Sequence, residues 1–200
     1  MANINTKVIT GKVRLSYANV WEPRPDNNGE EWYGTSILIS KEDKETLNKI
    51  KTVVNALKEE AKSKYGGKLP AKFHTPLRDG DEERPDDEAY VGHYFLNAKS
   101  KNKPGIAKPI GRGSDGKMKF QEITDETEVY SGCYVKASLN FYLFDRNGNR
   151  GIGVGLNNIV KVQDGEPLGG GRTRIEDEFA DEDFDDVLDF GDNDDDDFLS

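Results

Sequence analysis

The last 25 residues of the chain restrict its fold more than any other feature, because they carry charge of one sign only. Glu176–Ser200 contains 14 acidic residues and no basic residue. Charges at this density repel one another, and the few apolar residues between them cannot bury enough surface to offset the entropy of ordering the segment. We therefore predict a folded domain over residues 1–168 and a disordered acidic tail over 169–200, which begins at a run of glycines.

The rest of the chain has the opposite net charge. The whole sequence has a formal net charge of -10, from 38 Asp and Glu against 28 Lys and Arg. Residues 1–175 retain 24 acidic residues and all 28 basic ones, which is a net charge of +4. This asymmetry indicates a nucleic-acid or membrane partner, or a tail that regulates binding to one.

Aromatic residues interrupt the acidic tail. They are Phe179, Phe184, Phe190 and Phe198. A segment that only solubilises has no use for exposed Phe, whereas a short linear motif needs an apolar anchor flanked by charge. We therefore favour an interaction tail over a solubilising appendage. Its predicted partner-binding residues are Asp194, Asp195, Asp196, Asp197 and Phe198.

Composition excludes several classes of protein. The chain has no run of about 18 apolar residues, so we predict no membrane span and no membrane partner. Its first residues, MANINTKVIT, lack the apolar stretch of a secretion signal, and we expect a cytoplasmic protein. One cysteine, Cys133, and two histidines, His74 and His93, leave little for a metal site or for nucleophilic catalysis. We predict no metal, no cofactor and no enzymatic activity.

Apolar periodicity predicts the elements of the body. One helix begins at Ser40 and ends before Gly66, because apolar residues recur between them at three- and four-residue spacing. That stripe consists of Leu47, Ile50, Val54, Leu57 and Ala61, and we expect it to pack on a sheet. Alternation of apolar and polar residues predicts strands at Thr6–Pro23, Trp32–Ser40, Tyr90–Ser100, Val129–Asp145 and Ile152–Gly165.

These elements predict a mainly β fold with one long helix. Five strands with short connections can close into an OB-fold-like five-stranded Greek-key barrel, which removes exposed sheet edges. Barrels of this kind bind single strands on one face, with aromatic side chains for bases and cations for phosphates.

The outward faces of the predicted strands carry cations and aromatic residues together. Between Lys99 and Phe120 there are seven basic residues and one acid, in a segment that glycines and prolines are expected to keep irregular. Such a loop is suited to following a phosphate backbone. We predict a sequence-nonspecific binding face for a single-stranded nucleic acid, DNA or RNA, made by Lys12, Arg14, Phe95, Asn97, Lys99, Lys101, Lys103, Lys108, Arg112, Tyr134, Lys136 and Tyr142.

Two other functions remain open at this point. A metal-dependent nuclease could use Asp79, Asp81 and Glu82, although the spacing fits no calcium-loop template and a solvated surface loop is the better interpretation of Asp79–Glu88. An acidic assembly or chaperone-type interaction protein would use the tail to bind basic partners, but it has no need of the basic segment.

The layout resembles that of phage-encoded single-stranded DNA-binding proteins. The basic OB-like body, the basic loop and a tail that ends in DDDDFLS carry the resemblance. It implies roles in DNA replication, recombination or repair in a host cytoplasm, with a tail that recruits replication or recombination proteins and competes with DNA. Leu199 and Ser200 follow Phe198, whereas related tails often end at Phe. A monomer and a dimer are both compatible with the sequence.

Overall fold

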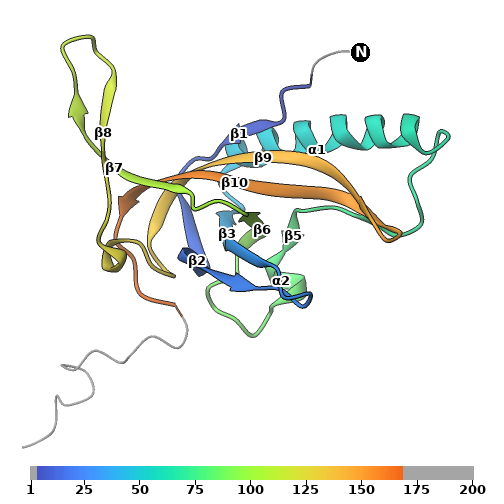
Figure 1. Ribbon diagram of the computed structural model, residues 1–200, viewed down its shortest axis with the longest axis horizontal. Coiled ribbons are helices and arrows are strands. Elements are labelled where there is room, and N and C mark those ends of the chain that lie inside the picture. The colour runs from blue at the N-terminus through green and yellow to red at the C-terminus, as the bar shows by residue number, and fades with distance from the viewer. Residues whose placement is uncertain (1–3, 169–200) are drawn as a thin grey trace, which may run out of the picture. The chain divides into compact units, whose positions relative to one another are not determined.

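The computed structural model describes residues 4–168, and the predictions for the acidic tail therefore lie outside the described residues. In this part the chain forms ten strands, two α-helices and one 3-10 helix, η1 (Figure 1). The helices are α1 (Lys44–Lys64), α2 (Gly80–Glu83) and η1 (Glu126–Glu128). The strands are β1 (Lys7–Ile9), β2 (Val13–Pro25), β3 (Glu31–Ser40), β4 (Phe73–His74), β5 (Arg78–Asp79), β6 (His93–Ser100), β7 (Gly105–Arg112), β8 (Met118–Glu122), β9 (Tyr134–Arg146) and β10 (Asn149–Gln163).

Five of these strands close into a barrel in the order β2-β3-β6-β10-β9, and β9 pairs back onto β2. Neighbouring strands are antiparallel except β6 and β10, which meet in parallel where Lys99 pairs with Gly155. A closed ring with this order is an OB-type barrel, and the predicted fold class is confirmed.

Strand alternation and the helix stripe together fill the core. On β9 the inward residues Val135, Ala137, Leu139 and Phe141 are all buried. They share one apolar cluster with the stripe of α1, which confirms that the helix packs on the sheet. Each aliphatic side chain buried in this way contributes about 1.5–3 kcal/mol of transfer free energy.

The long helix begins three residues later than predicted. Asp43, not Ser40, is its N-cap, and the Asp43 carboxylate accepts the Thr46 amide hydrogen at 3.0 Å. A carboxylate at this position satisfies a free amide and also favours the positive end of the helix dipole. The helix ends at Lys64, before Gly66 as predicted, and Gly66 and Gly67 both have positive φ.

The first predicted strand, Thr6–Pro23, is two strands in the structure. The break lies at Gly11, whose amide donates to the Thr46 hydroxyl at 2.7 Å. A Cβ at Gly11 would lie 2.7 Å from the Asp43 carboxylate, so the chain here passes directly against the start of α1. On one side of the break β1 pairs with the middle of β9, and on the other β2 pairs with β3.

The basic segment is a hairpin, which corrects the prediction of an irregular loop between Lys99 and Phe120. β7 and β8 pair from Ala107 and Glu122 outward to Arg112 and Met118. Figure 1 shows this hairpin standing away from the rest of the sheet. We call residues 108–121 the arm. Pro109 fits because it is itself exposed and a bulge follows it, so its missing amide costs little.

The acidic segment Asp79–Glu88 is mostly exposed at the surface, as predicted, and Lys41 holds two of its carboxylates in ion pairs. The Lys41 ammonium contacts the carboxylates of Asp79 and Asp81, at 2.7 Å each. These hydrogen bonds lower the pKa of Asp81 and raise that of Lys41.

Within residues 4–168, no group of three His, Cys, Asp or Glu side chains is placed to hold a metal ion. No helix in this part of the chain is long and apolar enough to cross a membrane.

Candidate nucleic-acid interface

The barrel topology indicates which face of the sheet takes a ligand. OB barrels bind oligonucleotides across their second and third strands and the loops that flank them. In this chain those strands are β3 and β6, and the loops are Asp26–Glu30 and the turn at Asn147–Gly148. Lys99 pairs with Gly34 and Asn97 pairs with Ser36, so the two side chains on β6 share the outward face.

Two lysines and a tryptophan meet at the open end of this face. The ammonium groups of Lys99 and Lys101 lie 4.2 Å and 3.9 Å from the centre of the Trp32 ring. Lys101 also donates to the Glu30 carboxylate at 3.0 Å, and Arg146 approaches the same group at 3.8 Å. The hydrogen bond from Lys101 lowers the pKa of Glu30, which keeps this carboxylate charged.

A polar cleft adjoins the Trp32 cluster, between the β2–β3 loop and the β9–β10 turn. It has a volume of about 710 Å³. The turn that forms one wall has positive φ at Asn147 and Gly148, as the Asn-Gly pair predicts. The cleft is therefore formed by the two loops that OB barrels use for binding. Its lining residues are Asn28, Glu30, Lys99, Phe144, Asp145, Arg146, Asn147 and Asn149.

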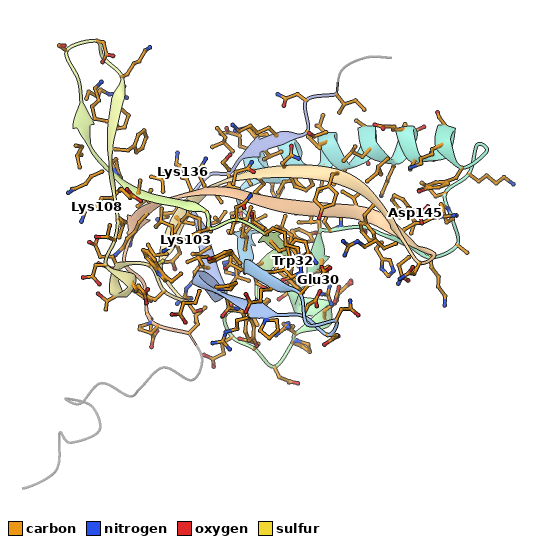
Figure 2. The ribbon with its side chains drawn as sticks, viewed as in Figure 1. Glu30, Trp32, Lys103, Lys108, Lys136 and Asp145 are labelled. Atoms are coloured by element: carbon orange, nitrogen blue, oxygen red, sulfur yellow. The ribbon has the colours of Figure 1, made fainter. Side chains whose placement is uncertain are left out.

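A second tryptophan repeats the arrangement at the foot of the arm. The Lys103 ammonium lies 5.0 Å from the centre of the Trp21 ring. The Trp21 indole donates to the Val129 carbonyl at 2.8 Å, which fixes the ring orientation. Lys103 and Trp21 line a recess of about 350 Å³ together with Glu122 and Ile123, beside the first residues of β7. Figure 2 shows Lys108, Lys103 and Trp32 in succession from the foot of the arm toward the middle of the body.

Phe95 lies on the predicted face but is not exposed, which corrects its assignment as a base-stacking residue. Its side chain is 1% exposed and packs edge-on against Tyr90, with ring centres 5.0 Å apart. The Arg78 and Arg84 guanidiniums approach the Phe95 ring within 6 Å. A second small core of Leu38, Tyr90 and Phe95 thus closes the half of the face that the Asp79–Tyr90 segment covers.

Lys12, Arg14 and Tyr134 come together, but in a separate cluster from Trp32. The charged groups of Lys12 and Arg14 lie 5.3 Å and 5.6 Å from the centre of the Tyr134 ring. Arg14 donates to the backbone carbonyls of Gly132 at 3.0 Å and Glu166 at 2.7 Å. The donors of Arg14 are therefore used to hold the end of the described chain against the barrel.

The remaining predicted binding residues differ in how accessible their side chains are to a ligand. Lys108 is held by Glu128, with Nζ to oxygen distances of 2.9 Å and 3.0 Å. Arg112 donates to the Gly116 carbonyl at 2.8 Å, within the arm. Lys136 is exposed on β9. Tyr142 is partly exposed and covers Gly153, where a Cβ would lie 2.6 Å from the ring.

Sequence reasoning missed three aromatic residues at this interface. The sequence predicts Trp21 and Trp32 only as members of strands, and Phe120 only as the end of an irregular segment. The structure places both tryptophans under lysine ammoniums and leaves Phe120 54% exposed. A usable signal was present, since each tryptophan lies close to the turn Asp26–Glu30 that connects the first two barrel strands.

The fold and this face identify an OB-barrel binding protein, and comparison with known proteins gives the family. The family model described as the Enterobacter phage Enc34 single-stranded DNA-binding protein matches residues 6–189, and the chain belongs to that family. The resemblance to phage-encoded single-stranded DNA-binding proteins is thereby confirmed.

The chain is also similar to individual proteins. Protein p50 of Acyrthosiphon pisum secondary endosymbiont phage 1 is 29% identical over 185 residues, which cover 88% of this chain and 93% of the relative. The Enc34 protein solved with single-stranded DNA is 22% identical, covers 82% of this chain and 90% of its own, and has a TM-score of 0.64. The single-stranded DNA-binding protein gp2.5 of bacteriophage T7 is 16% identical, covers 97% and 98%, and has a TM-score of 0.55. The two solved structures support the fold.

Proposed function

We propose that the protein binds single-stranded DNA without sequence preference during phage DNA replication inside the host cell, and that it acts by binding alone, without catalysis. The observation that carries this proposal is the placement of Lys99, Lys101 and Lys103 on Trp32 and Trp21 along the ligand face of an OB barrel. Membership in the Enc34 family supports the choice of single-stranded DNA over a basic protein partner, which an assembly factor would bind.

The binding step is an exchange of partners at each tryptophan. In the free protein an ammonium group occupies the ring face, in a cation–π contact worth about 0.5–1 kcal/mol at exposed sites. A base that stacks on an aromatic ring contributes about 1–3 kcal/mol, so the base displaces the lysine. The displaced ammonium then lies beside the phosphate that follows the base. Stacking needs only a π-face and phosphate pairing only charge, so neither step reads sequence.

The same proposal divides the chain into a binding domain, residues 1–168, and an acidic tail, residues 169–200. The tail has 14 acidic residues and two arginines, a net charge of -12, whereas residues 1–168 have a net charge of +2, so the tail can compete with DNA for the cations of the domain. When DNA displaces it, Asp194–Phe198 becomes available to replication or recombination proteins, with Phe198 as the apolar anchor and the four aspartates as its flanking charge.

Titration of a labelled oligo-dT, followed by fluorescence anisotropy at two salt concentrations, tests both parts. Trp32→Ala should weaken binding about 5- to 100-fold, the equivalent of one lost stacking contact, and Trp32→Phe should retain most of the affinity. Deletion of Glu176–Ser200 should tighten binding at matched salt. Equal affinity of wild type and a folded Trp32→Ala variant contradicts the stacking role, and unchanged or weaker binding after the deletion contradicts competition by the tail.

A further inference from the structure

The arm exposes apolar side chains that nothing in the described part of the chain covers. Ile110 is 60% exposed, Phe120 is 54% exposed and Met118 is 38% exposed. Every side chain of β8 is exposed. A hairpin that presents apolar residues to solvent, while packing on little else, is expected to bury them against a partner.

Two of the three exposed apolar residues of the arm, Phe120 and Met118, lie on one of its faces. Phe120 and Met118 alternate with Lys119 along β8, so the two apolar side chains lie on one face and the lysine on the other. Pro109 pairs with Phe120, and Arg112 pairs with Met118, which places these two residues of β7 on the apolar face as well. One face therefore combines an aromatic ring, a thioether and a guanidinium.

The charge of the arm selects the kind of partner. It carries Lys108, Arg112, Lys117 and Lys119 against a single acid, Asp115. Only Lys108 and Lys119 have a carboxylate partner within the described residues, at 2.9 Å and 3.8 Å. An aromatic ring flanked by cations fits a nucleic-acid strand, whose bases offer π-faces and whose phosphates are regularly spaced anions.

The arm is also continuous with the barrel interface. The recess at its foot is lined by Trp21, Lys103 and residues at the roots of β7 and β8. A strand that leaves Trp32 and passes Trp21 therefore reaches the arm next. The arm extends roughly 20 Å beyond Lys108, at about 3.3 Å per residue over six residues.

Resting on the single-strand binding proposed above, we propose that the arm is a second binding subsite for single-stranded DNA. Phe120 stacks a base of the strand that continues past the barrel. Arg112, which lies on the same face as Phe120, holds an adjoining phosphate. The arm thus lengthens the site without contributing to the binding of a short strand that the barrel alone can cover.

Affinity as a function of strand length separates the arm from the barrel. The protein is titrated with oligo-dT from about 4 to 20 nucleotides, a range that spans the usual site size of an OB fold. The comparison variant replaces residues 109–120 by Asn-Gly, a two-residue turn that joins the paired residues Lys108 and Gln121. We expect this variant to reach a limiting affinity at a shorter length than the wild type does.

Point variants then assign the effect to the aromatic ring. Phe120→Ala should match the wild type on short oligonucleotides and lose about 5- to 100-fold on long ones. Ile9→Ala is the matched control, since Ile9 is 58% exposed on β1 at the opposite end of the sheet, and it should bind all lengths normally. Phe120→Trp should retain the affinity and show more tryptophan quenching than the wild type with long but not with short oligonucleotides, because Trp21 and Trp32 report barrel binding in both proteins.

Four results would overturn the proposal. The first is equal affinity of Phe120→Ala and the wild type at every oligonucleotide length, and the second is an equal loss of affinity in Phe120→Ala at short and long lengths. The third is a comparable loss of affinity in Ile9→Ala. The fourth is a loss of self-association in Phe120→Ala with no length-dependent change in affinity, which would make a second copy of the chain the partner. Failure of the wild type to bind oligo-dT of any length would instead refute the proposed function itself.

Discussion

Replacement of one lysine along the proposed path of the DNA should change the salt dependence of binding. The size of the change should depend on whether that lysine already forms an ion pair with a carboxylate. Lys99 and Lys108 are both exposed or half-exposed lysines along the proposed path of the strand. The Lys99 ammonium contacts the Trp32 ring at 4.2 Å and has no ion pair within residues 4–168. The Lys108 ammonium lies 2.9 Å from the Glu128 carboxylate.

The magnitude follows from counterion release. A free lysine that neutralises a phosphate releases a counterion and contributes about 0.7 to the slope of log K against log salt for a single strand. Lys99→Ala should therefore reduce the slope by about 0.7, weaken binding about fivefold at about 0.1 M salt and about twofold at about 0.3 M. When Lys108 moves to a phosphate, Glu128 regains a counterion of its own. Lys108→Ala should then leave the slope nearly unchanged.

Equilibrium titration of labelled oligo-dT at four or more salt concentrations measures both slopes. Lys51→Ala is the control, because Lys51 lies on α1 within 5.9 Å of the Tyr94 ring, and Tyr94 is on the opposite face of β6 from Lys99. Equal slopes for the Lys99 and Lys108 variants, or an unchanged slope for Lys99→Ala, would refute the assignment of Lys99 to the phosphate path.

Two further predictions concern ion pairing and capping. The Lys101 hydrogen bond lowers the pKa of Glu30 from its ordinary 4.5. The pair therefore stabilises the fold fully above pH 4.5, and this contribution is lost as the pH falls through the lowered pKa. In urea denaturation, the stability advantage of the wild type over Glu30→Gln should disappear below the lowered pKa. By the counterion argument the same variant frees Lys101 and should steepen the salt slope, and an unchanged slope would contradict this. Asp43→Ala should lower the free energy of unfolding by about 1 kcal/mol, because the Thr46 amide loses its acceptor, while Asp43→Asn should retain most of it; equal losses would show that the cap does not act through this bond.

Much of the fold was predictable from the sequence because its determinants are local. Period-two alternation in Val129–Asp145 depends only on which residues can face a core, and the structure buries the predicted side of β9. The stripe of α1 was predictable for the same reason, and so was the Asn-Gly turn after β9. The binding class followed from a count of charges along the chain, since a segregation of 14 acids into 25 residues needs no coordinates to detect.

The composition of the interface was decided only by tertiary structure. Phe95 and Lys99 share one face of β6 by alternation, but only the fold brings Tyr90 over one of them and leaves the other on Trp32. The alternation of apolar and polar residues in a strand predicts which side of the sheet a residue faces. It does not predict which distant segment of the chain packs against that side. Likewise Lys108 and Lys103 are both lysines of one basic segment, and the position of Glu128, twenty residues away, separates their roles. Burial and charge pairing depend on contacts between residues far apart in the chain, and these contacts exist only once the barrel has closed.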